Sequence, residues 1–155
     1  MTSLNLAKVS VASAGLTTAS TAYSDGDQLG TILTFAPSGS PANLMIVSAT
    51  LVDAANIIGA VDLFLFDRSV TLAADNVPGP AVSDADSLFC EGVIEFPYPK
   101  LAGNNRIAHI DSLAIPVKPA VAATGFFGAL VTRSGHTFFG AVGNLQVILH
   151  YSTDS

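Results

Sequence analysis

Short runs of alternating apolar and polar residues, interrupted by glycine, proline, asparagine or aspartate, constrain the fold of this chain most strongly. Alternation with a period of two is typical of a β-strand with one buried face. No stretch of ten or more residues shows convincing helical periodicity. The pattern predicts an all-β fold, an antiparallel β-sandwich of about eight to ten strands with jelly-roll-like connections. We expect a single domain over residues 1–155.

The strands are separated by turn signals. Asp25-Gly26 is a strong turn dipeptide, and Gly103-Asn104-Asn105 and Ser134-Gly135 are hairpin-type turns. On the strand over residues 44–53, strict alternation places Leu44 and Ile46 on one face and Met45, Val47, Ala49 and Leu51 on the other. The predicted strands cover residues 7–11, 31–35, 44–53, 61–67, 89–96, 106–115, 125–132, 136–140 and 144–151.

The strand over residues 61–67 is apolar on both faces. Val61, Leu63 and Leu65 form one face, and Phe64 and Phe66 share the other with an aspartate. The second face needs its own cover, which is either a loop or a neighbouring subunit. Residues 68–88 are poor in strand signals and contain Val77-Pro78-Gly79-Pro80, so we expect a long loop excursion that contacts a neighbour.

Charged side chains are scarce. They make up 12% of the chain, against about 25% in an average soluble domain, while half of the residues are hydrophobic. A membrane-spanning helix is a poor explanation, because the best apolar stretch, residues 113–131, contains Pro116, Lys118 and Pro119. The N-terminus also lacks the pattern of a secretory signal. We therefore expect other protein chains to cover part of the surface, and no membrane partner.

The charge distribution argues against nucleic acid as a partner. The net charge is −6, and the six lysines and arginines are dispersed along the chain. Phosphate binding needs clustered cations that displace counterions. We therefore expect no nucleic-acid interface.

No arrangement of residues suggests catalysis. The histidines are His109, His136 and His150, and no serine lies in a Gly-x-Ser-x-Gly elbow. His109 shares a predicted strand face with Asp111, and we interpret it as a hydrogen-bonded or exposed strand histidine. His150 is a candidate for contact with a partner chain. We expect no catalytic residue.

Metal and cofactor sites are not expected either. Asp25 and Asp27 flank one glycine, and Asp84 and Asp86 flank an alanine, but neither pair continues as a calcium loop, so both indicate turns, with Ser83 capping a short helical turn. The single Cys90 is expected to be a small buried side chain.

The remaining candidate residues have structural explanations. Glu91 and Glu95 lie four apart on one predicted strand, about 13 Å from each other, which is too far for paired acid–base work on a sugar. Gly125 and Gly128 lack a phosphate-loop pattern and indicate close backbone packing. The phenylalanine pairs at 126–127 and 138–139 place one ring on each face of a strand, one for the core and one for an interface or second-face packing.

Several segments together resemble a known family. AYSDGDQLGTILTF, LVDAANIIGAVDLFLFD, SVTLAADNVPGPAVSDADSLFCEGVI and FFGALVTRS are similar to small acidic proteins encoded by tailed bacteriophages, over about Tyr23 to Leu149. The resemblance implies a virion structural role, with capsid decoration or cement protein as the best placement, often as a trimer over junctions between capsomers. It implies binding to the phage major capsid protein on the capsid exterior, after synthesis in the host bacterial cytoplasm.

Two other functions stay open. One is a tail- or fibre-associated module that recognises a host surface glycan or protein, although the absence of tryptophan counts against a sugar-stacking platform. The other is a small hydrolase, which would need a pocket with convergent polar groups that the sequence does not supply.

Overall fold

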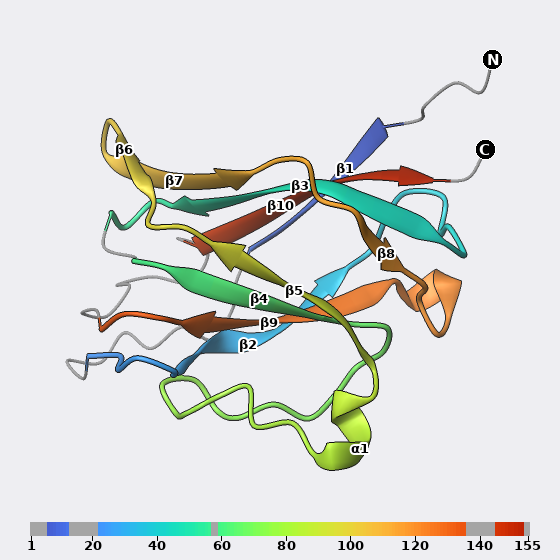
Figure 1. Ribbon diagram of the computed structural model, residues 1–155, viewed down its shortest axis with the longest axis horizontal. Coiled ribbons are helices and arrows are strands. Elements are labelled where there is room, and N and C mark those ends of the chain that lie inside the picture. The colour runs from blue at the N-terminus through green and yellow to red at the C-terminus, as the bar shows by residue number, and fades with distance from the viewer. Residues whose placement is uncertain (1–5, 13–21, 57–58, 136–144, 154–155) are drawn as a thin grey trace.

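The computed structural model describes residues 6–12, 22–56, 59–135 and 145–153. Within these ranges ten strands form two antiparallel sheets stacked face to face (Figure 1), which confirms the predicted β-sandwich. The larger sheet has the order β1 (Leu6–Ala12), β10 (Leu145–Thr153), β3 (Leu44–Asp53), β7 (Asn105–Ile110), β6 (Lys100–Ala102), and β8 (Ile115–Val117) also pairs with β3. The smaller sheet has the order β2 (Gln28–Phe35), β9 (Phe126–Thr132), β4 (Val61–Phe66), β5 (Cys90–Phe96).

The strand order is that of a jelly roll. Without the short β6 and β8, eight strands remain, in the orders β1-β10-β3-β7 and β2-β9-β4-β5. The chain crosses from one sheet to the other at nearly every connection, so strands distant in sequence, such as β1 and β10, pair along their whole length. Two interlocking Greek keys produce this arrangement, as the sequence pattern predicted.

The core lies between the two sheets. Val61, Leu63 and Leu65 point into it from β4, and Leu145, Val147, Leu149 and Tyr151 from β10, as their alternation predicts. The Phe35 and Phe126 rings stack at 4.9 Å between centroids. Gly125, with φ of 73°, lies so close to Phe35 that any Cβ would collide with that residue's carbonyl oxygen. This close approach confirms the predicted packing role of the glycine.

The predicted faces of β3 are wrong. The register pairs Tyr151 with Ile46 but His150 with Ser48, so Val47 is an extra residue in a β-bulge. A bulge reverses the alternation beyond it. Leu44 and Ile46 therefore share the buried face with Ala49 and Leu51, while Met45 points outward.

One other predicted strand is divided in the structure, and another lies outside the described residues. The segment over 106–115 divides into β7 and β8, because the chain turns at Ser112, whose φ is 56°. The predicted strand over residues 136–140, with His136, Phe138 and Phe139, lies outside the described residues, as do residues 141–144.

The loop over residues 67–89 packs under the smaller sheet, together with the short helix α1 (Asp84–Ser87) (Figure 1). Phe66, Val70 and Ala129 are buried there, and Phe64, Leu72, Val82, Phe89 and Phe127 pack against them. Of the two covers expected for the second face of β4, a loop or a neighbouring subunit, the structure has the loop. This chain covers its own Phe64 and Phe66.

Candidate interaction surfaces

One partly buried carboxylate attaches the covering loop to the sandwich. Asp75 accepts hydrogen bonds from the Tyr23 hydroxyl, at 2.8 and 2.9 Å to its two oxygens, and from the Gly30 amide at 2.6 Å. A carboxylate with several donors is a strong hydrogen-bond acceptor. No local pattern in the sequence predicts a role for Asp75, because its partner Tyr23 lies 52 residues away along the chain.

Backbone hydrogen bonds continue this attachment along β2. The Asn76 amide donates to the Gln28 carbonyl at 2.9 Å, the Gln28 amide to Val77 at 2.8 Å, and the Gly79 amide to Gly26 at 2.9 Å. Two of the segments that carry the family resemblance, around Tyr23–Asp27 and Asp75–Asn76, therefore meet in space. The hydrogen bonds between these two segments hold the loop on the smaller sheet.

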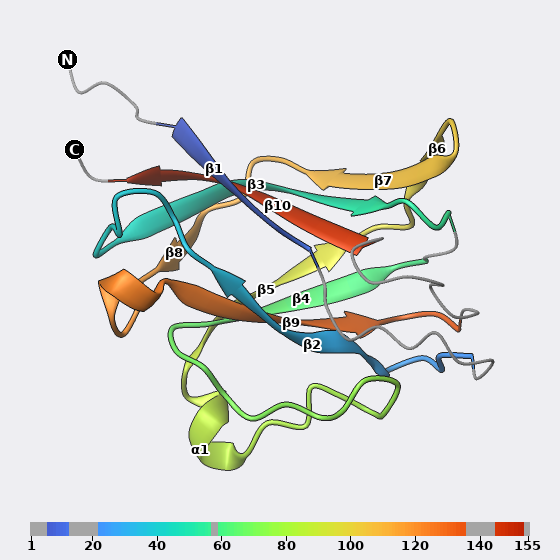
Figure 2. The same cartoon turned by 180° about the vertical axis from the view of Figure 1, so that it is seen from behind.

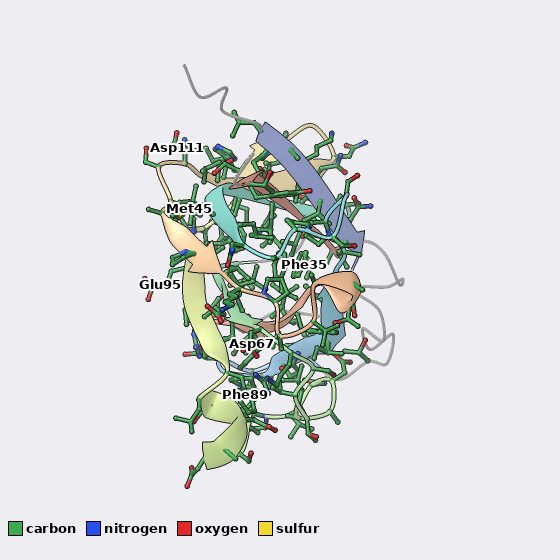
Figure 3. The ribbon with its side chains drawn as sticks, turned by 90° about the vertical axis from the view of Figure 1, so that its right-hand side faces the viewer. Phe35, Met45, Asp67, Phe89, Glu95 and Asp111 are labelled. Atoms are coloured by element: carbon green, nitrogen blue, oxygen red, sulfur yellow. The ribbon has the colours of Figure 1, made fainter. Side chains whose placement is uncertain are left out.

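The two ends of the loop are joined by Arg68, and α1 lies close to the second end. Ser83 caps the helix by accepting a hydrogen bond from the Asp86 amide at 3.1 Å, as predicted for this segment. The Arg68 guanidinium lies 3.8 Å from the Phe89 ring centroid and forms a 2.7 Å ion pair with Asp67. Figure 3 shows Asp67 and Phe89 together on the loop side of the smaller sheet.

The outer face of the larger sheet has no such cover within the described ranges. It lies at the top of Figure 1, opposite the loop and α1. The strand registers place a continuous set of side chains on this open face. Their polar members are mostly uncharged, and the set contains no aspartate or glutamate. The open face comprises Leu6, Lys8, Ser10, Met45, Ser48, Thr50, Val52, Lys100, Ile107, His109, Pro116, Gln146, Ile148, His150 and Ser152.

Three large apolar side chains on the open face are strongly accessible. Leu6 is 57% exposed, Met45 37% and Ile107 36%. Beside Met45, a shallow hollow of about 230 Å³ is lined by Asn43, Leu44, Met45, Pro116 and Ser152. Scattered apolar residues are normal on a surface, but a face with so few charges is typical of a protein contact.

More than half of the acidic residues lie on the other half of the molecule. Of the twelve acidic residues in the chain, seven lie on the smaller sheet or its covering loop. Among the described residues, two of these acids have a cation in an ion pair, Asp67 with Arg68 and Asp62 with Arg133. The two outer faces therefore differ in charge as well as in cover. The seven acids are Asp62, Asp67, Asp75, Asp84, Asp86, Glu91 and Glu95.

A groove of about 400 Å³ lies at the hairpin of β6 and β7. We call it the hairpin groove, and its lining includes Tyr98, Lys100, Leu101, Ile107 and His109. Tyr98 is 65% exposed and Leu101 69%. Arg106 supports one wall of the groove, because its guanidinium donates to the Tyr98 hydroxyl at 3.2 Å and lies 5.7 Å from the centroid of the Tyr98 ring.

The edge strand of the smaller sheet forms another exposed surface. Glu91, Val93 and Glu95 on β5 make up what we call the β5 edge surface, where Val93 is 41% exposed. Partial burial raises the pKa of the Glu91 carboxyl, and the nearby Asp67 carboxylate raises it further. Figure 3 shows Glu95 on the outside of the sandwich, away from the stacked core around Phe35.

His109 and His150 lie on the open face, and Asp111 is exposed beyond the end of β7. The His109 Nδ1 atom lies 2.7 Å from the Thr50 hydroxyl across the β3–β7 pair, so His109 is the hydrogen-bonded strand histidine that we predicted. Asp111 follows the end of β7 and does not share its strand face. His150 is half-buried, and its Nδ1 has no hydrogen-bond partner among the described residues.

Cys90 contradicts its prediction. It is exposed, with its sulfur 3.6 Å from the Gly92 carbonyl oxygen. The register of β4 and β5 shifts at this point, so that Cys90 pairs with Phe66 and Glu91 is displaced from the ladder. An edge-strand bulge removes the cover that a small thiol would need.

The aspartate pairs have turn roles. Asp27 accepts the Ser24 amide at 2.7 Å in the turn before β2, and the Asp84–Asp86 pair lies in the capped α1. Over the part of the chain that the structure describes, no three histidine, cysteine, aspartate or glutamate side chains group together as metal ligands. Among the same residues, no helix is long and apolar enough to cross a membrane.

Comparisons with known proteins do not identify a family. No protein-family model and no curated protein matches this chain. Among solved structures, the chain is similar to the PRD1 vertex protein P5, with a TM-score of 0.33 and 11% identity over 99% of this chain and 100% of that one. It is also similar to a chain in the structure of a marine algae virus of the order Picornavirales, with a TM-score of 0.25 and 11% identity over 98% of this chain and 69% of that one. Since both TM-scores lie below 0.5, the fold assignment rests on the strand order alone.

Proposed function

We propose that this chain is a non-catalytic structural protein of a bacteriophage particle, which binds the outside of the capsid as a decoration or cement subunit. The open face is the observation that carries the proposal. It is a continuous sheet surface with exposed Leu6, Met45 and Ile107 and without carboxylates. Such a surface is suited to permanent contact with another protein.

The other half of the molecule is suited to solvent. The covering loop buries the apolar side chains beneath it and presents acidic groups outward, among them Asp84 and Asp86 on α1. A surface of one charge sign keeps protein particles soluble and apart. With the open face on the shell, the acidic side would point away from the particle.

The resemblance of four sequence segments to small acidic proteins of tailed phages supports the same assignment. The segments at Tyr23–Asp27 and Asp75–Asn76 hold the covering loop in place, so the resemblance extends to the features that make the two faces different. We further propose that the protein self-associates as a trimer on the capsid exterior, in contact with the major capsid protein.

Electron cryo-microscopy of particles of the phage that encodes this chain tests the proposal. We expect density for the sandwich on the shell exterior, in a copy number set by the shell symmetry, with β1, β10, β3 and β7 facing the capsid. Absence of the chain from purified particles would overturn the proposal. Density at the tail tip alone, in low copy number, would instead favour the host-recognition module.

A further inference from the structure

Two edges of the sandwich lie on the same side of the molecule. In the larger sheet β6 pairs only with Asn105–Ile107, so within the described residues no strand pairs with the outer edge of Ala108–Ile110. In the smaller sheet β5 is the terminal strand. β5 contacts β7 and β8, and all three lie toward the viewer in Figure 1, whereas β1 and β2 lie in front in Figure 2. Unpaired strand edges are ready sites for contact with another chain.

The two edges carry opposite charges. The hairpin groove has Lys100 in its lining, Arg106 beside Tyr98 and no carboxylate from the described residues. The β5 edge surface has Glu91 and Glu95 and no cation. The chain therefore holds a cationic, apolar groove and an anionic, apolar strand next to each other on one side.

Neither charge is neutralised within the described residues. Lys100 and Glu95 are both exposed and form no ion pair there. Glu95 also lies directly opposite Asp62 on β4, a pairing of like charges that weakens a sheet. Asp62 already has its own cation, Arg133, at 2.5 Å. A cation from another molecule would relieve the repulsion at Glu95.

The hairpin groove and the β5 edge surface both also expose apolar side chains. The loop cover of the smaller sheet reaches Phe64, which is partly buried, but Val93, opposite it on β5, is 41% exposed. Tyr98 and Leu101 are the most exposed apolar side chains of the hairpin groove. On the β5 edge surface, the exposed Val93 side chain lies between the carboxylates of Glu91 and Glu95. The hairpin groove offers the complementary groups, which are the apolar side chains of Tyr98 and Leu101 and the ammonium of Lys100.

We propose that the hairpin groove of one copy binds the β5 edge surface of a second copy, with Lys100 of one molecule beside Glu95 of the next. This contact rests on the proposed function, because it specifies how the trimer forms. A contact between two different surfaces generates a ring when the rotation between copies closes. The hairpin groove shares Lys100, Ile107 and His109 with one margin of the open face, so the ring leaves the part of the open face on β1, β10 and β3 free for the shell.

Charge reversal with rescue tests the contact. Sedimentation velocity of the purified full chain, at low and high salt, measures the association of wild type and variants. We expect Lys100→Glu and Glu95→Lys each to weaken association at least about tenfold, and the double variant to recover it to within about threefold, because like charges across an interface repel and the swapped pair attracts. Circular dichroism spectra should show that all variants remain folded.

Matched controls carry the same charge changes elsewhere. Lys8→Glu lies on the open face and Asp84→Lys on α1, and both residues are exposed. These variants should associate like the wild type. Equal weakening by controls and test variants, or a double variant that stays dissociated while folded, would overturn the proposed contact.

The proposal about the contact and the proposal about function fail in different ways. Particles lacking the chain can be mixed with purified wild type and sedimented to measure binding to the shell. A chain that is monomeric in solution and whose Lys100→Glu variant still occupies shells like the wild type would overturn the contact and leave the function standing. A wild-type ring that fails to bind the shells would overturn the function and leave the contact standing.

Discussion

On the smaller sheet the outer face is covered by residues 67–89, whereas on the larger sheet no described segment covers the outer face. The cover consists of buried contacts around Phe66 and Val70 and of hydrogen bonds to Asp75. The open face keeps Leu6, Met45 and Ile107 accessible and has few charges. The difference indicates that one outer face contributes to the stability of this chain through its own loop, whereas the other outer face stays accessible.

The low charge content has a narrower meaning once the covered face is known. The sequence predicts that neighbouring chains cover part of the surface, and it leaves the second face of β4 to either a loop or a neighbouring subunit. The structure shows that this chain covers Phe66 itself, leaving it 1% exposed. The remaining argument for a neighbour rests on the open face and on the side that holds the hairpin groove, and it no longer rests on Phe64 and Phe66.

The largest predicted effect concerns the covered face. Phe66→Ala should lower the free energy of unfolding by about 3–5 kcal/mol, because it leaves a cavity between the sheet and its loop. Ile107→Ala on the open face should cost less than about 1 kcal/mol, because the side chain is already in contact with water. Urea denaturation measures both, and similar losses for the two variants would show that the faces do not differ in this way.

The next effect concerns the attachment of the loop. Asp75→Ala should cost about 1.5–3 kcal/mol, because it leaves the Tyr23 hydroxyl and the Gly30 amide without their carboxylate acceptor. Hydrogen exchange should increase in the loop over residues 67–82 more than in β10. Asp84→Ala on the exposed surface of α1 is the control. Unchanged exchange in Asp75→Ala would mean that the buried contacts around Phe66 hold the loop alone.

A change on the open face should affect binding and leave the fold intact. The double variant Leu6→Glu with Met45→Glu should bind particles that lack the chain at least about tenfold more weakly, or about 1.4 kcal/mol, because two carboxylates would enter an apolar contact away from the hairpin groove. Leu88→Glu is the matched control, since Leu88 is 82% exposed on the opposite side. If Leu88→Glu has the larger effect on co-sedimentation, the loop side is the side that faces the shell.

The smallest effect concerns Glu91 at the boundary of the covered face. Burial and Asp67 raise its pKa above the ordinary value of 4.5, so the folded chain binds this proton more tightly than the unfolded chain. Stability from this group is therefore present at low pH and is lost as the pH rises through the folded pKa. Glu91→Gln should raise the melting temperature slightly at pH 7 and change it little at pH 3. The increase should be small because the side chain is only partly buried, and Glu95→Gln is the control.

Local pattern was sufficient for most of the strands. The bounds of β3 over residues 44–53 and the buried side of β10 follow from alternation, and the turn at Asp25-Gly26 follows from its dipeptide. The pattern failed at Val47, where a bulge reverses the alternation, and at Cys90, where an edge irregularity exposes a thiol. Both bulges arise from how a strand pairs with a distant partner, which a single strand's sequence does not record.

The candidate surfaces divide in the same way. Alternation predicts that β4 has two apolar faces, because side-chain direction in a strand is a local property with a period of two. Which segment covers the second face depends on contacts such as Tyr23 with Asp75, which join residues 52 positions apart. The sequence shows that Lys100 and Glu95 carry opposite charges, but it does not show where the two residues lie. The packing of the two sheets places them on one side of the molecule. The sequence alone thus determined the class of fold and its inward side chains, and the tertiary structure decided which outer surfaces remain for a partner.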